Sequence, residues 1–309
     1  KRARLPYKPK RYINVLFKGQ SLKVMNHRLR LPLKNKQYLW YSIPEIKGKI
    51  VQAEVSFNKL YLTLQSEIDI PENTSNTVAG VDMGIIHTAV MTDGVNSLGI
   101  VGRGIRSIKQ GHAKNLAKLS RLISKTKKGS KRRKKLYRAK WRLRDRTDNL
   151  LRNALHHVSR RITEFCVDNA VVKLVVGDLE GINTNKKKKR RRQVNQEVGK
   201  MEFGRLKSYL TYKLAEKGIK LDSIKENYTS QTCPACGNRK KVSGRVYKCS
   251  CGYVGVRDLI GASNIRNLYL NGEIKAGVDI PGEDLKYLRP IRLKRIERSS
   301  KPLAPAQVA

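Results

Sequence analysis

The hydrophobic and polar positions of residues 11–70 predict a β-rich region. Short apolar runs alternate there with turn residues, which is typical of half-buried strands. The runs are RYINVLF, LRLPL, QYLWYSI, KIVQAEVSF and LYLTLQSEI. The polar, proline-containing stretch PENTSN at 71–76 predicts a linker. We therefore expect a small β-rich domain before residue 77.

The pattern from residue 77 onward predicts three strands and then two long basic helices. Asp93-Gly94 is expected to form the tight turn between the second and third strands. The second helix keeps apolar residues at helical spacing, with arginines 138, 142 and 146 in a separate stripe. The apolar positions are Leu136, Leu143, Leu150, Ala154, Val158, Ile162 and Phe165.

The remaining pattern predicts strands and helices in alternation. AVVKLVVG is expected to be a fourth strand, MEFGRLKSYLTYKLAEKG a helix ended by Gly218, IKLDSIKE a fifth strand and RDLIGASNIRNLYL a last helix. Three antiparallel strands followed by helix, strand, helix, strand and helix is the order of the α/β RNase H-like fold. In that fold the fourth strand lies beside the first, and the fifth beside the fourth.

Four of the five cysteines lie within nineteen residues and predict a metal site. Two thiol pairs are separated by twelve residues, and each pair has a glycine nearby. They are Cys233 with Cys236 and Cys249 with Cys251, next to Gly237 and Gly252. Four thiolates leave no open position, so we expect a structural tetrahedral Zn²⁺ in a zinc ribbon. The alternative is four thiols without metal, and the lone Cys166 is expected in the core.

The charge of the chain predicts a polyanionic partner. Lys and Arg number 67 against 24 Asp and Glu, a net charge of +43, for which nucleic acid is the usual partner. Much of the excess lies in the runs 125–146 and 186–192, which are expected to contact phosphates, although the second run also fits a nuclear-localisation signal. Trp40 and Trp141 are either stacking residues for bases or core residues.

Other locations are less compatible with the composition. No stretch approaches the ~18 apolar residues of a spanning helix, and no signal peptide opens the chain. We expect a cytoplasmic, nucleoid-associated protein, and the family resemblance described next implies a prokaryotic one.

Four motifs together resemble one family. GVDMGI, YTSQTCPACGN, YKCSCGY and RDLIGASNI resemble the RuvC-type nuclease of the TnpB proteins of insertion sequences and of the miniature type V CRISPR effectors. The resemblance covers about residues 10–270. It implies RNA-guided cutting of DNA, with a guide RNA and a target DNA as partners. It also implies a RuvC site in which an Asp, a Glu and an Asp hold two Mg²⁺ ions.

The resemblance assigns two of these three acids directly. Asp82 and Asp258 match the first and the third, but Gly177 stands where the family has the second, a Glu. Glycine at 177 would let Glu226, at the end of the fifth strand, reach across as a relocated acid, and we favour that assignment. The alternatives are Asp178 or Glu180 as a substitute, or no working site. Asp178 directly follows Gly177, and neighbouring residues on a strand face opposite sides. Its side chain is therefore expected on the wrong face of the sheet to replace an acid at position 177.

The domain boundaries follow from these assignments. We expect a nucleic-acid-binding, barrel-like wedge domain at 1–76, a RuvC domain at 77–232 and 252–270, a zinc ribbon at 233–255 and a flexible basic arm at 271–309. The chain starts at Lys1 without an initiator Met and lacks the family's helical recognition lobe, so either the sequence is truncated or the lobe is reduced.

Three functions compete at this point. The first is an RNA-guided DNA endonuclease that leaves 5′-phosphate and 3′-hydroxyl ends. The second is a nuclease-dead, RNA-guided repressor of the same family. The third is a zinc-ribbon RNA-binding protein of ribosomal type, for which Asp82 and Asp258 would be exposed and far apart.

Overall fold

The computed structural model divides the chain into two compact units, 1–69 and 70–309, which are described separately. It describes residues 14–46, 48–56, 59–65, 67, 69–72, 74–178, 202–225, 228–242, 244–278 and 285–289. The boundary falls seven residues before the one expected at 76/77. The reason is visible at Pro71, whose carbonyl lies directly against Gly218 of the second unit.

The first unit is β-rich, as the sequence predicts, and forms two three-stranded antiparallel sheets in its described part. One sheet has the order β1 (Val15–Lys18), β5 (Lys49–Ser56), β6 (Lys59–Gln65). The other has the order β2 (Lys23–Met25), β3 (Arg28–Pro32), β4 (Tyr38–Ser42). Short 3₁₀ turns, η1 (Gly19–Ser21) and η2 (Lys34–Lys36), follow β1 and β3. Leu29, Leu31, Ile43 and Ala53 form the core.

The second unit contains a six-stranded sheet in the order β11-β10-β7-β8-β9-β14. Its strands are β7 (Thr77–Asp82), β8 (His87–Thr92), β9 (Ser97–Val101), β10 (Val171–Asp178), β11 (Lys220–Lys225) and β14 (Lys286–Leu288). Strands β7, β8 and β9 are antiparallel, whereas β10 and β11 continue parallel to β7. The expected placement of the fourth strand beside the first, and of the fifth beside the fourth, is therefore confirmed.

The turn between β8 and β9 lies where Asp93-Gly94 predicts it. The Asp93 carboxylate accepts hydrogen bonds from the N–H groups of Val95 and Asn96, at 2.8 and 2.6 Å. Gly94 has a φ of 98°, which a residue with a side chain rarely adopts. The turn comprises four residues, 93–96, instead of the two expected.

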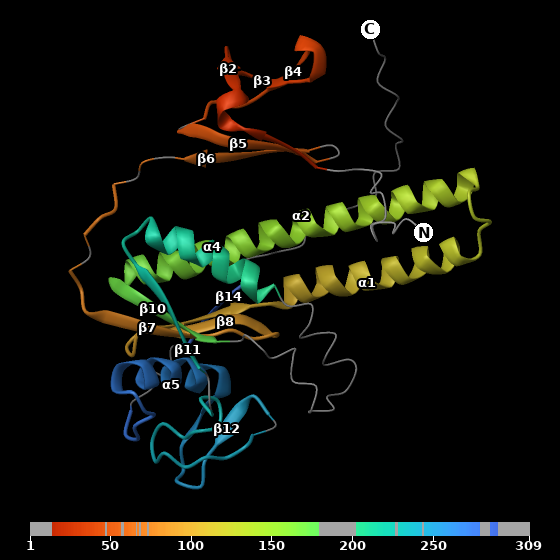
Figure 1. Cartoon of the computed structure of the whole chain (residues 1–309). Coiled ribbons are helices and arrows are strands. Elements are labelled where there is room, and N and C mark those ends of the chain that lie inside the picture. Colours follow the sequence, from red (N-terminus) through yellow and green to blue (C-terminus); the bar gives the residue numbers. More distant parts are fainter. Residues whose placement is uncertain are drawn as a thin grey trace, which may run out of the picture. The chain divides into compact units, whose positions relative to one another are not determined.

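Helices cover both faces of the sheet (Figure 1). One face packs against α2 (Lys131–Asp168) and α4 (Phe203–Ala215), in a core that joins Val81 and Val176 to Ile162 and Leu210. The other face packs against α5 (Arg257–Asn271), where Val78 and Val175 contact Ile265. Because side chains alternate along a strand, Gly80 and Asp82 share the α5 face with Val78.

Helix α5 approaches β7 very closely. A methyl group placed on Gly80 would overlap the carbonyl of Ala262 and lie 2.8 Å from the backbone nitrogen of Arg266. The Arg266 Nε donates a 2.8 Å hydrogen bond to the carbonyl of Val78. Only glycine at position 80 allows this contact between helix and strand.

The two predicted basic helices are α1 (Arg103–Ser124) and α2, which pack against each other as a long hairpin (Figure 1). The Arg133 guanidinium closes the connection by donating to the carbonyls of Ile123 and Thr126, both at 2.8 Å. The predicted apolar face of α2 is correct except at Leu150, which is 40% exposed, while Leu151 is buried. Trp40 and Trp141 are also exposed, so neither is a core residue, whereas Cys166 is fully buried.

The predicted flexible arm at 271–309 needs a correction. Residues 286–288 form β14, which pairs in parallel with β9 at the edge of the sheet. The three-residue run KYL is too short to show a strand pattern in the sequence, and its pairing partner is remote. Among the described residues, no helix combines the length and the apolar character needed to cross a membrane.

The buried face of α2 provides the first prediction. Leu155→Ala should destabilise the second unit by about 2–5 kcal/mol, because Leu155 is 2% exposed within the core and truncation leaves a cavity. The matched control is Leu150→Ala on the same helix, which should cost less than about 1 kcal/mol. Denaturant unfolding measures both, and equal effects would contradict the described packing.

Candidate functional site

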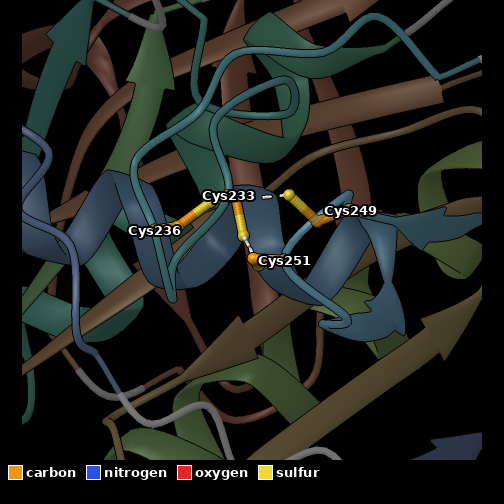
Figure 2. A group of neighbouring side chains, drawn as sticks. All are labelled: Cys233, Cys236, Cys249 and Cys251. Atoms are coloured by element: carbon orange, nitrogen blue, oxygen red, sulfur yellow. Dashed lines mark hydrogen bonds between the residues drawn. The ribbon is translucent and has the colours of Figure 1, made fainter.

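The four clustered cysteines form a metal-binding geometry. Their Sγ atoms all lie within 4.8 Å of one another, and Figure 2 shows them gathered at one point. The Cys233–Cys251 and Cys236–Cys249 sulfurs are 3.7 and 3.5 Å apart. Four sulfurs around Zn²⁺ at about 2.3 Å would be about 3.8 Å apart. The donor set and its spacing therefore fit a tetrahedral Zn²⁺.

Local backbone geometry explains how the two thiol pairs face each other. Gly237 and Gly252 have φ angles of 74° and 91°, so each lets the chain turn back directly after a cysteine, as the sequence suggests. Strands β12 (Val246–Lys248) and β13 (Val254–Val256) form the antiparallel pair that holds the second knuckle.

The ribbon packs onto α5 instead of standing apart from the α/β unit. The fully buried Tyr247 and Cys233 contact Ile260 of the helix. Asn264, also fully buried, donates hydrogen bonds to the carbonyls of Thr229 and Thr232, at 2.7 and 2.9 Å. The helix that faces β7 therefore also positions the metal cluster.

The thiols of the cluster differ in their environments. Burial raises the pKa of Cys233 to about 12, whereas the backbone N–H of Cys251 lowers the pKa of Cys249 to about 6. Peptide N–H groups that stabilise a thiolate are typical of metal-binding knuckles.

Metal analysis tests the cluster. The purified chain should contain close to one equivalent of zinc, and Cys233→Ser should lose most of it because three thiolates hold the ion less tightly. Cys166→Ala is the matched control and should retain the zinc, since Cys166 lies in the core of the sheet. Less than about half an equivalent in the unmodified chain would contradict the assignment.

The Asp82 carboxylate lies against the first turns of α5. A methyl group on Gly261 would lie only 2.8 Å from Asp82 Oδ2 and 3.2 Å from its Cγ. Asp258 precedes Gly261 by three residues, and residues at that spacing are neighbours on one helix face. The structure therefore brings Asp82 and Asp258, the two acids assigned by motif, to the same end of α5.

The Asp258 carboxylate is held by three basic side chains. Its Oδ2 lies 2.7 Å from His87 Nδ1 and 2.9 Å from Arg245 Nη1, and its Oδ1 lies 3.7 Å from Arg257 Nη2. The side chain is 14% exposed and stands in the first turn of α5, where the helix dipole also favours negative charge.

The second acid is not settled by the described residues. Glu226 and Glu180 lie outside them, as does the basic run 186–192. Leu174 and Val176 pack on the face of the sheet that α2 and α4 cover. Strand residues two apart share a face, so Asp178 lies on that face too and points away from Asp82.

Gly177 lies on the α5 face, like Val175. Its register partner in β11 is Ile224, which also packs near α5. On the α5 face of the sheet, Gly177 of β10 therefore lies between Ile224 of β11 and the end of β7, and it leaves that position without a side chain.

Sequence reasoning did not identify His87, Arg245 or Gly261 as parts of this site. His87 follows the GVDMGI motif by two residues, and a polar residue at the start of a buried strand was an available signal. Arg245 offered none, because one arginine among so many basic residues does not stand out. Gly261 could have been noticed as the first of three small residues, GAS, inside a helix.

The contact between Gly261 and Asp82 can be tested by stability. Gly261→Val should cost about 1–3 kcal/mol more than Gly111→Val, its matched control in α1, where an added Cβ meets no atom within 4 Å. Asp82→Ala should reduce that difference, since it removes the side chain that valine would meet. Additive effects of the two changes in a double-mutant cycle would contradict the contact.

The chain matches two family models in adjoining regions. Residues 60–183 match a family described as "Probable transposase", OrfB_IS605, and residues 203–265 match the "Cas12f1-like, TNB domain" family. The first region contains β7 to β10 with the helices α1 and α2, and the second contains α4, β11, the four-cysteine ribbon and most of α5. Insertion-sequence proteins and miniature CRISPR effectors are thus the class to which both matches point.

Individual relatives agree with these matches. The chain is 28% identical to "Putative RNA-guided DNA endonuclease InsQ" of Escherichia coli (strain K12), over 86% of this chain and 68% of that protein. It is also 28% identical to the CRISPR-associated endodeoxyribonuclease Cas12f2 of a Micrarchaeota archaeon, over 63% of this chain and 36% of that protein. The resemblance inferred from the motifs is confirmed.

A solved structure has a similar fold. A Cas12f1–sgRNA–target DNA complex matches with a TM-score of 0.54 at 17% identity, over 71% of this chain and 46% of that one. The chain spans about two thirds of InsQ and less than half of these Cas12f proteins.

Proposed function

We propose that this chain is an RNA-guided DNA endonuclease whose RNase H-like, RuvC-type site consists of Asp82, Glu226 and Asp258. The observation that carries the proposal is that the Asp82 carboxylate lies against Gly261 of α5, one helical turn after Asp258, although Asp82 and Asp258 are 176 positions apart in the sequence. The naming of InsQ and Cas12f2 as DNA endonucleases supports the reaction.

The donor atoms suit the expected metal. Asp82 and Asp258 offer carboxylate oxygens, the ligands that Mg²⁺ prefers. Two bound Mg²⁺ ions would activate water and stabilise the leaving oxygen of a phosphodiester. Asp82 would hold its ions from the rigid end of β7, and Asp258 from the first turn of α5. His87 would keep the Asp258 carboxylate oriented through its Nδ1 contact.

Glu226 is the proposed third acid. The described part of β11 ends at Lys225, one residue before it. Ile224 packs toward α5, and strand residues two apart share a face, so the alternation of β11 favours the same face for residue 226. The absence of a side chain at Gly177 would leave room for the longer glutamate. Asp178, on the other face, is a poor substitute.

The partners follow from the charge and the relatives. We propose a guide RNA and its DNA heteroduplex, held by the basic hairpin of α1 and α2 and by a wedge-like first unit. The exposed arginines 138, 142 and 146 on α2 support phosphate contacts there. Base pairing would then read the DNA sequence while the protein reads the shape of the duplex.

A nuclease-dead repressor is the second candidate because two observations favour it. Gly177 removes the acid that the family uses at that position, and two arginines and a histidine surround Asp258. The third candidate, a zinc-ribbon RNA-binding protein of ribosomal type, requires Asp82 and Asp258 to be exposed and far apart. The proximity of Asp82 and Asp258 at α5 argues against it.

Cleavage assays with purified ribonucleoprotein separate these candidates. Asp258→Asn and Glu226→Gln should each lower Mg²⁺-dependent DNA cutting at least about 100-fold, because each removes a charged ligand. Binding of the copurified guide RNA should be unchanged. Asp178→Asn, on the opposite face of the sheet, is the matched control and should cut normally.

The outcomes assign the function. Full cutting by Glu226→Gln rules out the relocated acid. DNA binding by the unmodified chain without any cutting, at saturating Mg²⁺, supports the repressor instead.

A further inference from the structure

Arg245 of the zinc ribbon forms an ion pair with Asp258, one of the proposed metal ligands. Arg245 directly precedes β12, and its Nη1 lies 2.9 Å from Asp258 Oδ2 and 3.4 Å from His87 Nδ1. A hydrogen bond from the Arg257 N–H to the Arg245 carbonyl, at 2.8 Å, ties this part of the ribbon to the start of α5. The backbone at Arg245 is therefore anchored independently of the contact that its side chain makes with Asp258.

The guanidinium occupies a position that a cation bound to Asp258 would need. A carboxylate oxygen that accepts hydrogen bonds from His87 and Arg245 has little capacity left for a divalent ion. Direct coordination also requires an approach of about 2.1 Å, closer than a guanidinium leaves room for. Arg245 and a metal at Oδ2 would thus exclude each other.

Phosphate is the natural competitor for this arginine. Arg245 is 41% exposed, so part of its side chain already faces solvent. Guanidinium groups bind phosphate and carboxylate through the same planar donors, and the substrate of the proposed reaction supplies phosphates beside the acids. Exchange of the carboxylate for a phosphate would release Asp258 at the moment when substrate arrives.

We propose that Arg245 is a latch on the metal site: without nucleic acid it holds Asp258 in place of a divalent cation, and a nucleic-acid phosphate releases it. This inference rests on the proposed function and concerns its regulation. Metal loading and nucleic-acid binding are then coupled, and by linkage each strengthens the other.

Mn²⁺ binding to the full chain without nucleic acid tests the latch directly. Arg245→Gln should bind Mn²⁺ about tenfold more tightly than the unmodified chain, measured by electron paramagnetic resonance or calorimetry. Arg245→Lys should lie between them, since lysine keeps the charge but lacks the planar fork. If Arg245 only stabilised the fold around the site, Arg245→Gln would bind Mn²⁺ more weakly than the unmodified chain.

Arg239→Gln is the matched control. It removes the same charge from the same ribbon, but Arg239 stacks on the ring of Tyr228, 4.7 Å from its centroid. An equal rise in Mn²⁺ affinity for both variants would reduce the effect to general charge repulsion and overturn the latch.

A short single-stranded DNA completes the test. After subtraction of the Mn²⁺ bound by DNA alone, DNA should raise the Mn²⁺ affinity of the unmodified chain and leave that of Arg245→Gln nearly unchanged. An equal rise in both would overturn the latch.

Asp258→Asn distinguishes failure of the latch from failure of the site. If Asp258→Asn abolishes Mn²⁺ binding while Arg245→Gln has no effect, the latch is wrong and the metal site stands. If no variant binds Mn²⁺ in a manner sensitive to Asp258, both proposals are wrong.

Discussion

The close approach of α5 to β7 is the contact on which both sites of the second unit depend. Gly80 on the strand and Gly261 on the helix remove the two side chains that would hold these elements apart. The Asp82 carboxylate fills the space beside Gly261, and Asp258 stands one turn earlier on the same helix. A wider separation would leave each acid on its own element, too far apart for the shared ion that we propose.

The same helix connects these acids to the zinc ribbon. Ile260 contacts the buried Cys233 and Tyr247, and Asn264 holds the carbonyls of the segment that precedes the first thiol pair. A metal ion held by the four thiols would therefore do more than stabilise a small loop. It would fix both cysteine pairs and the start of β12, directly before which Arg245 reaches Asp258.

Local patterns predicted most of the fold, and the motif resemblance assigned Asp82 and Asp258, which the fold brings to the same end of α5. Strands β7 to β11 of the sheet, the two long basic helices and the cysteine cluster each follow from short-range periodicity or spacing. Strands β2 and β14 did not, because three residues cannot display a period and their pairing is decided by remote partners. Leu150 and Leu151 show a related limit: near the middle of a long helix, a one-residue shift decides which side chain is buried.

The side chains around Asp258 lay beyond sequence reasoning for a different reason. Arg257 is the sequence neighbour of Asp258, but His87 comes from a strand and Arg245 from a ribbon loop, and only the tertiary fold brings these two to the Asp258 carboxylate. Their meeting has an electrostatic logic in a chain of net charge +43, whose field repels a free divalent cation. On the proposed function, basic side chains would neutralise Asp258 while nucleic acid is absent. A bound polyanion would then reverse the local field, attract the metal ion and compete for Arg245. The charge excess that would bind the substrate would thus also couple metal loading to its presence.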